Sequence, residues 1–200
     1  MKPDRASATA RLIALATVMR ESDAPAGAAP WCARMLSTHR ADRLLLRSVR
    51  HPIGRSFWNA VERLTLPGMI AHWLRRKREI DRLASNAAAE GFTQLLVLGA
   101  GLDTLSWRLA EAGVFEHVVS ADHPATLAAV ERAVAPTSLV TLVPIDLADG
   151  LTDSVAAALD PNAPTLVVAE GVLMYLTEQQ VERTLSDIAN LPAPRVRLVA

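Results

Sequence analysis

The glycines at positions 99 and 101 and the aspartate at 122 are the residues whose types and spacing first suggest chemistry. The glycines follow an apolar run, "TQLLVL", and Asp122 ends a second run, "HVVSAD". Glycines at the end of a strand let the backbone approach a ligand, and an acid about 20 residues later can accept hydrogen bonds from ribose hydroxyls. Thr104 stands where a dinucleotide fingerprint has its third glycine. The pattern therefore favours a cofactor with a ribose but no pyrophosphate. A tight strand-to-helix turn without a ligand is the alternative.

Two further acids follow apolar runs later in the chain. Asp146 ends "LVTLVPID", and Glu170 follows "TLVVA". Charges beside buried strands are costly unless something pairs with them. Because the ends of parallel strands meet at one edge of a sheet, acids at three successive strand ends indicate a polar ligand there. A single acid in such a place is more often a helix cap or an ion-pair partner.

The stretches "LVLGAGLDTLSWRL", "ADHPAT" and "AEGVLMYL" resemble one branch of class I S-adenosylmethionine-dependent methyltransferases, the leucine carboxyl methyltransferase-like branch. "SATA" at 7–10 and "HWLRRKREID" at 72–81 are similar to the N-terminal helical part of that branch. The resemblance runs from about residue 7 to the end of the chain. It implies S-adenosyl-L-methionine as the cofactor and a Rossmann-like sheet with a helical cover over the site.

The resemblance also implies roles for single residues at the nucleoside end of the cofactor. Gly99 and Gly101 would let the chain pass close to the cofactor, and Asp122 would accept hydrogen bonds from its ribose. Asp146 and Leu147 would bracket the adenine with a polar contact and an apolar wall.

At the amino-acid end of the cofactor, the resemblance implies that Arg76 pairs with the carboxylate and that Glu170 lies near the ammonium group. The charge run "RRKRE", which contains Arg76, also has an interpretation without a ligand. Runs of charge usually form a solvated helix face, which we expect for Arg75, Lys77 and Arg78 and which is the alternative for Arg76. Family members often carry an acid where this chain has Ser120, so one contact near Asp122 differs.

The elements that must position these residues change in character near residue 91. Before it, helical patterns predict helices over 7–22, 31–50, 55–65 and 69–89. After it, strand and helix patterns alternate, which predicts an α/β fold with a mostly parallel sheet and helices on both faces. A capping-box pattern at Thr177 and Gln180 begins the last helix, and "RVRLVA" is the fifth strand. We expect residues 1–90 to be a helical cover and 91–200 the Rossmann-like core of one structural unit.

Length is a departure from the family pattern. A class I methyltransferase sheet continues after its fifth strand with a helix and an antiparallel hairpin, whereas this chain stops at Ala200. We therefore expect the C-terminal strands to be missing. The fifth strand would then be an exposed sheet edge, which invites association between copies of the chain.

Composition restricts the partners. Lys plus Arg equals Asp plus Glu at 21 each, so no overall field favours nucleic acid or an anionic membrane. No apolar run is long enough to span a bilayer, and the acids around "LIALATVM" disfavour a signal peptide. The single cysteine, Cys32, agrees with a reducing compartment. We expect a cytoplasmic protein, with no metal site because the histidines do not cluster.

Together with these observations, the resemblance implies an O-methyltransferase that acts on a hydroxyl or carboxylate of a small molecule. The chemistry needs alignment of the acceptor and exclusion of water more than a catalytic triad. His123 and Tyr175 lie beside the expected site and are candidate proton acceptors, but no catalytic residue is assigned. A non-catalytic S-adenosylmethionine-binding protein is the main alternative, and an NAD-binding dehydrogenase is the third.

Overall fold

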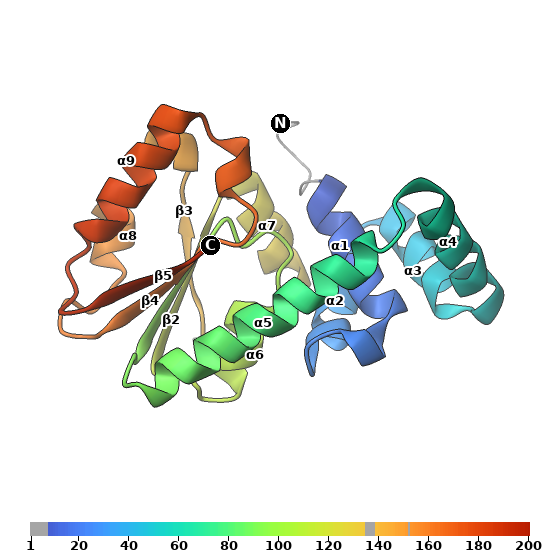
Figure 1. The fold of residues 1–200 in the computed structure, drawn as a ribbon, viewed down its shortest axis with the longest axis horizontal. Coiled ribbons are helices and arrows are strands. Elements are labelled where there is room, and N and C mark those ends of the chain that lie inside the picture. Colours follow the sequence, from blue (N-terminus) through green and yellow to red (C-terminus); the bar gives the residue numbers. More distant parts are fainter. Residues whose placement is uncertain (1–7, 135–138, 152) are drawn as a thin grey trace.

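The computed structural model of the chain describes residues 8–134, 139–151 and 153–200. Its first part is helical. The helices are α1 (Ala8–Met19), α2 (Ala28–Leu36), α3 (Arg40–Arg50), α4 (Pro52–Thr65) and α5 (Met69–Ala89), with a short 3-10 helix, η1, at Glu21–Asp23. The long helix α5 runs from this group of helices to the sheet (Figure 1).

Strands and helices alternate in the second part, as the sequence predicted. The strands are β1 (Gln94–Leu98), β2 (His117–Asp122), β3 (Thr141–Pro144), β4 (Thr165–Val168) and β5 (Val196–Val199). The helices are α6 (Leu105–Glu111), α7 (Pro124–Ala133), α8 (Asp153–Ala157) and α9 (Glu178–Ala189), with 3-10 helices η2 (Leu147–Asp149) and η3 (Leu173–Tyr175). Thr177 and Gln180 form the predicted capping box at the start of α9.

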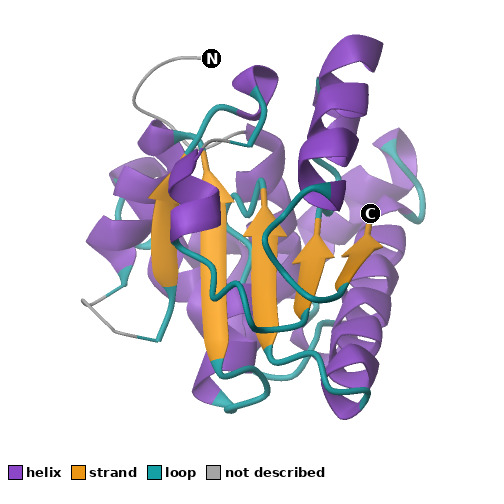
Figure 2. Ribbon diagram, turned by 90° about the vertical axis from the view of Figure 1, so that its left-hand side faces the viewer, coloured by secondary structure: helices purple, strands orange, loops and turns teal. Residues whose placement is uncertain are grey.

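The five strands form one sheet in the order β3-β2-β1-β4-β5, and every described pair is parallel (Figure 2). In the register, Leu96 of β1 lies between Val119 of β2 and Val167 of β4. The strand order reverses at β1, because the chain moves outward through β2 and β3 and then returns to the other side as β4. Ligands of parallel sheets bind at the carboxyl ends of the strands beside such a reversal.

Both faces of the sheet are covered. Leu95 and Val97 of β1 pack with the N-terminal helices and with α6 and α7, whereas Leu96 and Leu98 pack with α8 and α9. This alternation follows from the two-residue period of a strand. It confirms the predicted Rossmann-like α/β fold with helices on both faces. Within the described ranges, no helix combines the length and apolar character needed to cross a bilayer.

The predicted single helix over 31–50 is wrong. It is broken at residues 37–39, where His39 has extended backbone angles (φ −111°, ψ 139°). The Ser37 hydroxyl donates to the Ala33 carbonyl at 2.7 Å and the Thr38 hydroxyl donates to the Met35 carbonyl at 3.0 Å. Such side-chain bonds compete with the helical hydrogen bonds of the backbone. The predicted first helix, 7–22, ends at Met19, and its residue 7 lies outside the described residues.

Candidate functional site

A cavity of about 1040 Å³ lies at the carboxyl ends of β1, β2 and β4, and residues of α1 and α5 line its other side. Its position is the one that the reversal of strand order predicts for a ligand. The cavity is lined by all seven residues predicted for the site, which are Arg76, Gly99, Gly101, Asp122, Asp146, Leu147 and Glu170.

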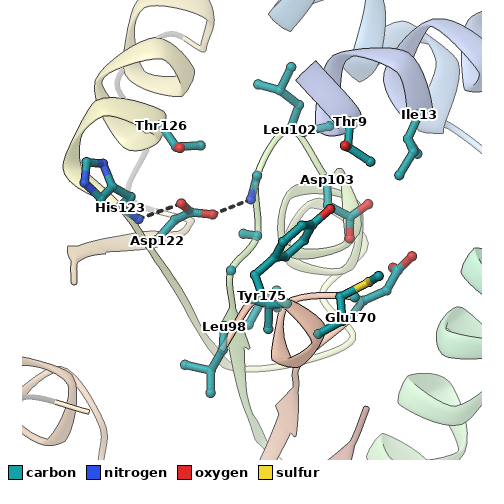
Figure 3. Close-up of a pocket in the computed structure, with 18 of the residues that line it drawn as sticks. Thr9, Ile13, Leu98, Leu102, Asp103, Asp122, His123, Thr126, Glu170 and Tyr175 are labelled. Carbon is teal, nitrogen blue, oxygen red and sulfur yellow. Dashed lines mark hydrogen bonds between the residues drawn. The ribbon is translucent and has the colours of Figure 1, made fainter. Parts of the chain in front are cut away.

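Asp122 is placed at the end of β2 with its carboxylate toward the glycine loop (Figure 3). Its Oδ2 accepts from the Gly101 backbone N–H at 2.6 Å, and its Oδ1 accepts from the His123 backbone N–H at 2.5 Å. Burial raises the pKa of this carboxyl, although the two backbone hydrogen bonds and Thr126 oppose the rise. An ionised carboxylate has about four acceptor positions, so each oxygen can still accept a bond from a ligand hydroxyl.

The two glycines have backbone conformations that other residues rarely adopt, with φ of 63° at Gly99 and 56° at Gly101. A Cβ atom at Gly99 would lie 2.4 Å from Cγ2 of Val172, and a Cβ at Gly101 would lie 3.4 Å from Cβ of Ala10. Gly99 is therefore required by the protein's own packing, independently of any ligand. The sequence pattern indicated that a ligand comes close to the backbone of this loop. At Gly99, the group that comes close is the side chain of Val172.

Asp146 and Leu147 mark the end of the cavity beside β3. Asp146 is exposed, and its side chain accepts from the Ala148 backbone N–H at 3.0 Å, which begins η2. Leu147 is buried and packs in the apolar cluster on the α8 and α9 face of the sheet. The structure thus provides one polar and one apolar group side by side at this end of the cavity.

The other end of the cavity holds four charged side chains that contact one another. Arg76 pairs with Oε1 of Glu170 at 2.9 Å. Lys77 Nζ lies 2.7 Å from Oδ1 of Asp103 and 3.3 Å from Oε2 of Glu170. We call Arg76, Lys77, Asp103 and Glu170 the charge cluster. In Figure 3, Asp103 and Glu170 lie on the opposite side of the glycine loop from Asp122.

Lys77 corrects the sequence prediction. We expected a solvated helix face at this position, but the side chain is only 11% exposed. Arg75 and Arg78 are exposed, as expected. The helical period of the sequence could have predicted that Lys77 is buried, because it lies three residues from buried Leu74 and three from buried Ile80. Asp103 was likewise missed as a site residue, since the sequence shows no partner for it within one helical turn.

Opposite charges set the protonation of the cluster. Burial alone would lower the pKa of Lys77, but the carboxylates of Asp103 and Glu170 raise it above its usual range. Burial alone would raise the pKa of Asp103, but Lys77 lowers it through charge and a hydrogen bond. Both groups are therefore charged at neutral pH. Two cations and two anions in contact can bind the carboxylate and ammonium groups of a zwitterion.

Both candidate proton acceptors, His123 and Tyr175, line the cavity. The Nδ1 atom of His123 accepts from the Ala125 backbone N–H at 3.2 Å, so this histidine begins α7. Tyr175 is 65% exposed in η3. Neither observation assigns a catalytic role.

Fold and cavity define a Rossmann-like protein with a large polar and apolar cavity at the strand reversal. Comparison with known families gives the particular one: the model of the family described as leucine carboxyl methyltransferase matches residues 8–189. The chain belongs to this family. The match includes both the helices before β1 and the sheet, in agreement with the resemblance noted in the sequence.

Curated relatives carry matching names. One from Mycobacterium avium is 36% identical over 130 residues, which cover 62% of this chain and 41% of the relative. Others from Frankia alni and Streptomyces avermitilis are each 35% identical over 129 residues, covering 62% of this chain and 45% of the relative. All three are named as presumed S-adenosyl-L-methionine-dependent methyltransferases. The aligned part spans less than half the length of these relatives.

Proposed function

We propose that this chain binds S-adenosyl-L-methionine and serves methyl transfer to a hydroxyl or carboxylate of a small molecule. The observation that carries the proposal is that Asp122 and the charge cluster line opposite parts of one cavity. A ribose and an amino-acid zwitterion are the two polar parts of this cofactor, and the two ends provide partners for both. Family membership and the names of the relatives support the same cofactor.

The proposed roles follow from the contacts. Asp122 would accept from the ribose hydroxyls, and Asp146 with Leu147 would hold the adenine. Arg76 would bind the carboxylate of the cofactor and Glu170 its ammonium group. Since Arg76 and Glu170 contact each other, binding would exchange part of this ion pair for contacts with the ligand.

When bound, the cofactor supplies a methyl group that is activated on a sulfonium. The protein's own part is to orient the two reactants and to exclude water. Ile13, Met69, Trp73 and Met174 give the cavity apolar walls, which suits an acceptor with an apolar body. A carboxylate acceptor needs no general base, so the absence of an assigned catalytic residue is compatible with transfer.

Isothermal titration calorimetry tests the cofactor. S-adenosylmethionine and S-adenosylhomocysteine should both bind, and NADH should not compete with them. Tight binding of NADH without a response to either sulfur compound would overturn the proposal in favour of a dehydrogenase. Transfer of a radiolabelled methyl group to a panel of hydroxy compounds and carboxylic acids tests catalysis. Binding without transfer to any acceptor would support the non-catalytic alternative.

The remaining expectations are also proposals. We propose residues 1–90 as a cover and 91–200 as the binding core, although apolar residues of both parts share one core cluster.

In the described sheet, β5 lies at one edge and pairs with β4, and an open edge can pair with another copy. Sedimentation velocity over a concentration series should show association. A chain that stays monomeric at every concentration would contradict it.

A further inference from the structure

Helix α4 carries an apolar stripe on the face that points away from the protein. Ile53, Phe57 and Leu64 are 76%, 59% and 86% exposed. Together with exposed Ala60, they follow the helical spacing i, i+4, i+7 and i+11, so they share one face. Single exposed apolar residues are common, but a continuous row on one helix requires an explanation. We call these four residues the α4 stripe.

The neighbouring helix α3 carries a row of arginines. Arg40, Arg43, Arg47 and Arg50 are all exposed, and their spacing of three and four residues places them on one face of α3. The buried residues Leu46 and Val49 lie beside this row, on the side of the helix that packs against the protein. Helices α3 and α4 contact each other and form the end of the molecule farthest from the sheet (Figure 1).

The charge of these two helices is not balanced locally. Residues 39–66 contain six arginines but two acids, Asp42 and Glu62. Both acids are buried, and each pairs with an arginine from outside this segment, Arg11 or Arg20. Across the described part of the chain, no acid forms an ion pair with any of the six arginines of the segment. The balanced charge of the whole sequence therefore hides a basic surface.

We propose that the surface formed by the α3 arginines and the α4 stripe binds an anionic lipid bilayer. Helices that lie in the membrane interface combine an apolar face with arginines that meet the lipid head groups. A nucleic acid would match the arginines but would leave the stripe in water. A second copy of the chain would cover the stripe but would bring the four α3 arginines of each copy to the same contact. The bilayer satisfies both features, and α4, at 14 residues, would lie on the membrane without spanning it.

Co-sedimentation with vesicles tests the proposal. The 200-residue chain should sediment with vesicles that contain phosphatidylglycerol and phosphatidylcholine, but not with vesicles of phosphatidylcholine alone. Added salt should weaken the binding. The double variant Arg43→Gln/Arg47→Gln should partition about thirtyfold more weakly, because each arginine near a membrane surface contributes roughly a factor of five.

The triple variant Ile53→Ser/Phe57→Ser/Leu64→Ser should also lose binding. The matched control, Leu185→Ser/Arg132→Gln, changes an exposed apolar residue on α9 and an exposed arginine on α7, and it should bind like the parent. Circular dichroism and urea unfolding establish that the variants are folded. None of these positions lines the cofactor cavity, so S-adenosylmethionine affinity should be unchanged in all of them.

Three results would overturn the proposal. The first is no sedimentation with anionic vesicles. The second is vesicle binding that the stripe variant leaves unchanged, since arginines alone would then explain it. The third is that the parent chain self-associates but does not bind vesicles, and that the stripe variant abolishes the self-association. The stripe would then be an interface between copies of the chain.

Discussion

Replacing Lys77 with methionine tests whether the charge cluster holds this end of the cavity together. Methionine keeps the length and apolar stem of the side chain but removes the cation. Asp103 and Glu170, which both contact Lys77 Nζ, would then face each other without it. The variant Lys77→Met should fold, but it should be less stable than the parent.

The structure allows the size of the effect to be worked out. Breaking a buried ion pair by removing one partner costs about 3–5 kcal/mol. Glu170 keeps its contact with Arg76, and Asp103 still experiences the charge of Arg108, so the lower end applies. We expect a loss of about 3 kcal/mol in the free energy of unfolding. For a chain of this size, this corresponds to a decrease of roughly 6–12 °C in the melting temperature.

Urea unfolding followed by circular dichroism measures the loss. The control is Arg75→Met, which removes an exposed cation from the same helix and should change stability by less than about 0.5 kcal/mol. In the double variant Lys77→Met/Asp103→Asn, the unpaired carboxylate is also neutralised, so part of the loss should be recovered. Unchanged stability in Lys77→Met, or strictly additive losses in the double variant, would refute the reasoning.

The same pair predicts a pH dependence. The pKa of Asp103 is lowered in the folded protein, so its contribution to stability is present above the ordinary value of about 3.9 and is lost as pH falls through the folded value. In Lys77→Met, burial is no longer opposed by that cation, and the pKa of Asp103 should rise. The variant should then gain stability relative to the parent as pH falls, so the difference between the two proteins should narrow.

Three further predictions concern single residues. Asp122→Ala should weaken S-adenosylmethionine binding by about 2 kcal/mol, or roughly thirtyfold, because two ribose hydroxyls would lose a charged acceptor; calorimetry that finds parental affinity would exclude the ribose role. Gly99→Ala should lower the free energy of unfolding by about 2–4 kcal/mol. The alanine would have to adopt the left-handed backbone conformation of Gly99, and its Cβ would overlap Val172. The added substitution Val172→Ala should restore part of this loss in urea unfolding, and no restoration would argue against the overlap. Cys32 should resist iodoacetamide at pH 8 in the native protein and react in urea, because burial raises the pKa of its thiol to about 12; rapid native labelling, followed by mass spectrometry, would contradict it.

The sequence by itself determined the order and type of the elements that build the sheet. The apolar runs at 93–98 and 117–122 became β1 and β2, and the glycines and acids after the runs lie around one cavity. This succeeded because parallel strands are short, apolar and bounded by turn residues, and because their carboxyl ends must meet at one edge. Local pattern and global topology therefore agree in this half of the chain.

The tertiary structure alone decided which charges meet. Arg76 and Glu170 are 94 residues apart in the chain, and Lys77 reaches Asp103 and Glu170 from a helix whose charge run looked solvated. It also decided that Val172 fills the space above Gly99, and that the acids near the α3 arginines pair with Arg11 and Arg20 of other elements. The periodicity of a sequence predicts which face of a helix or strand is apolar, because this face is set by residues that are close together in the chain. Ion pairs and surface charge depend on distances between elements, which the sheet and the path of α5 set only once the chain has folded.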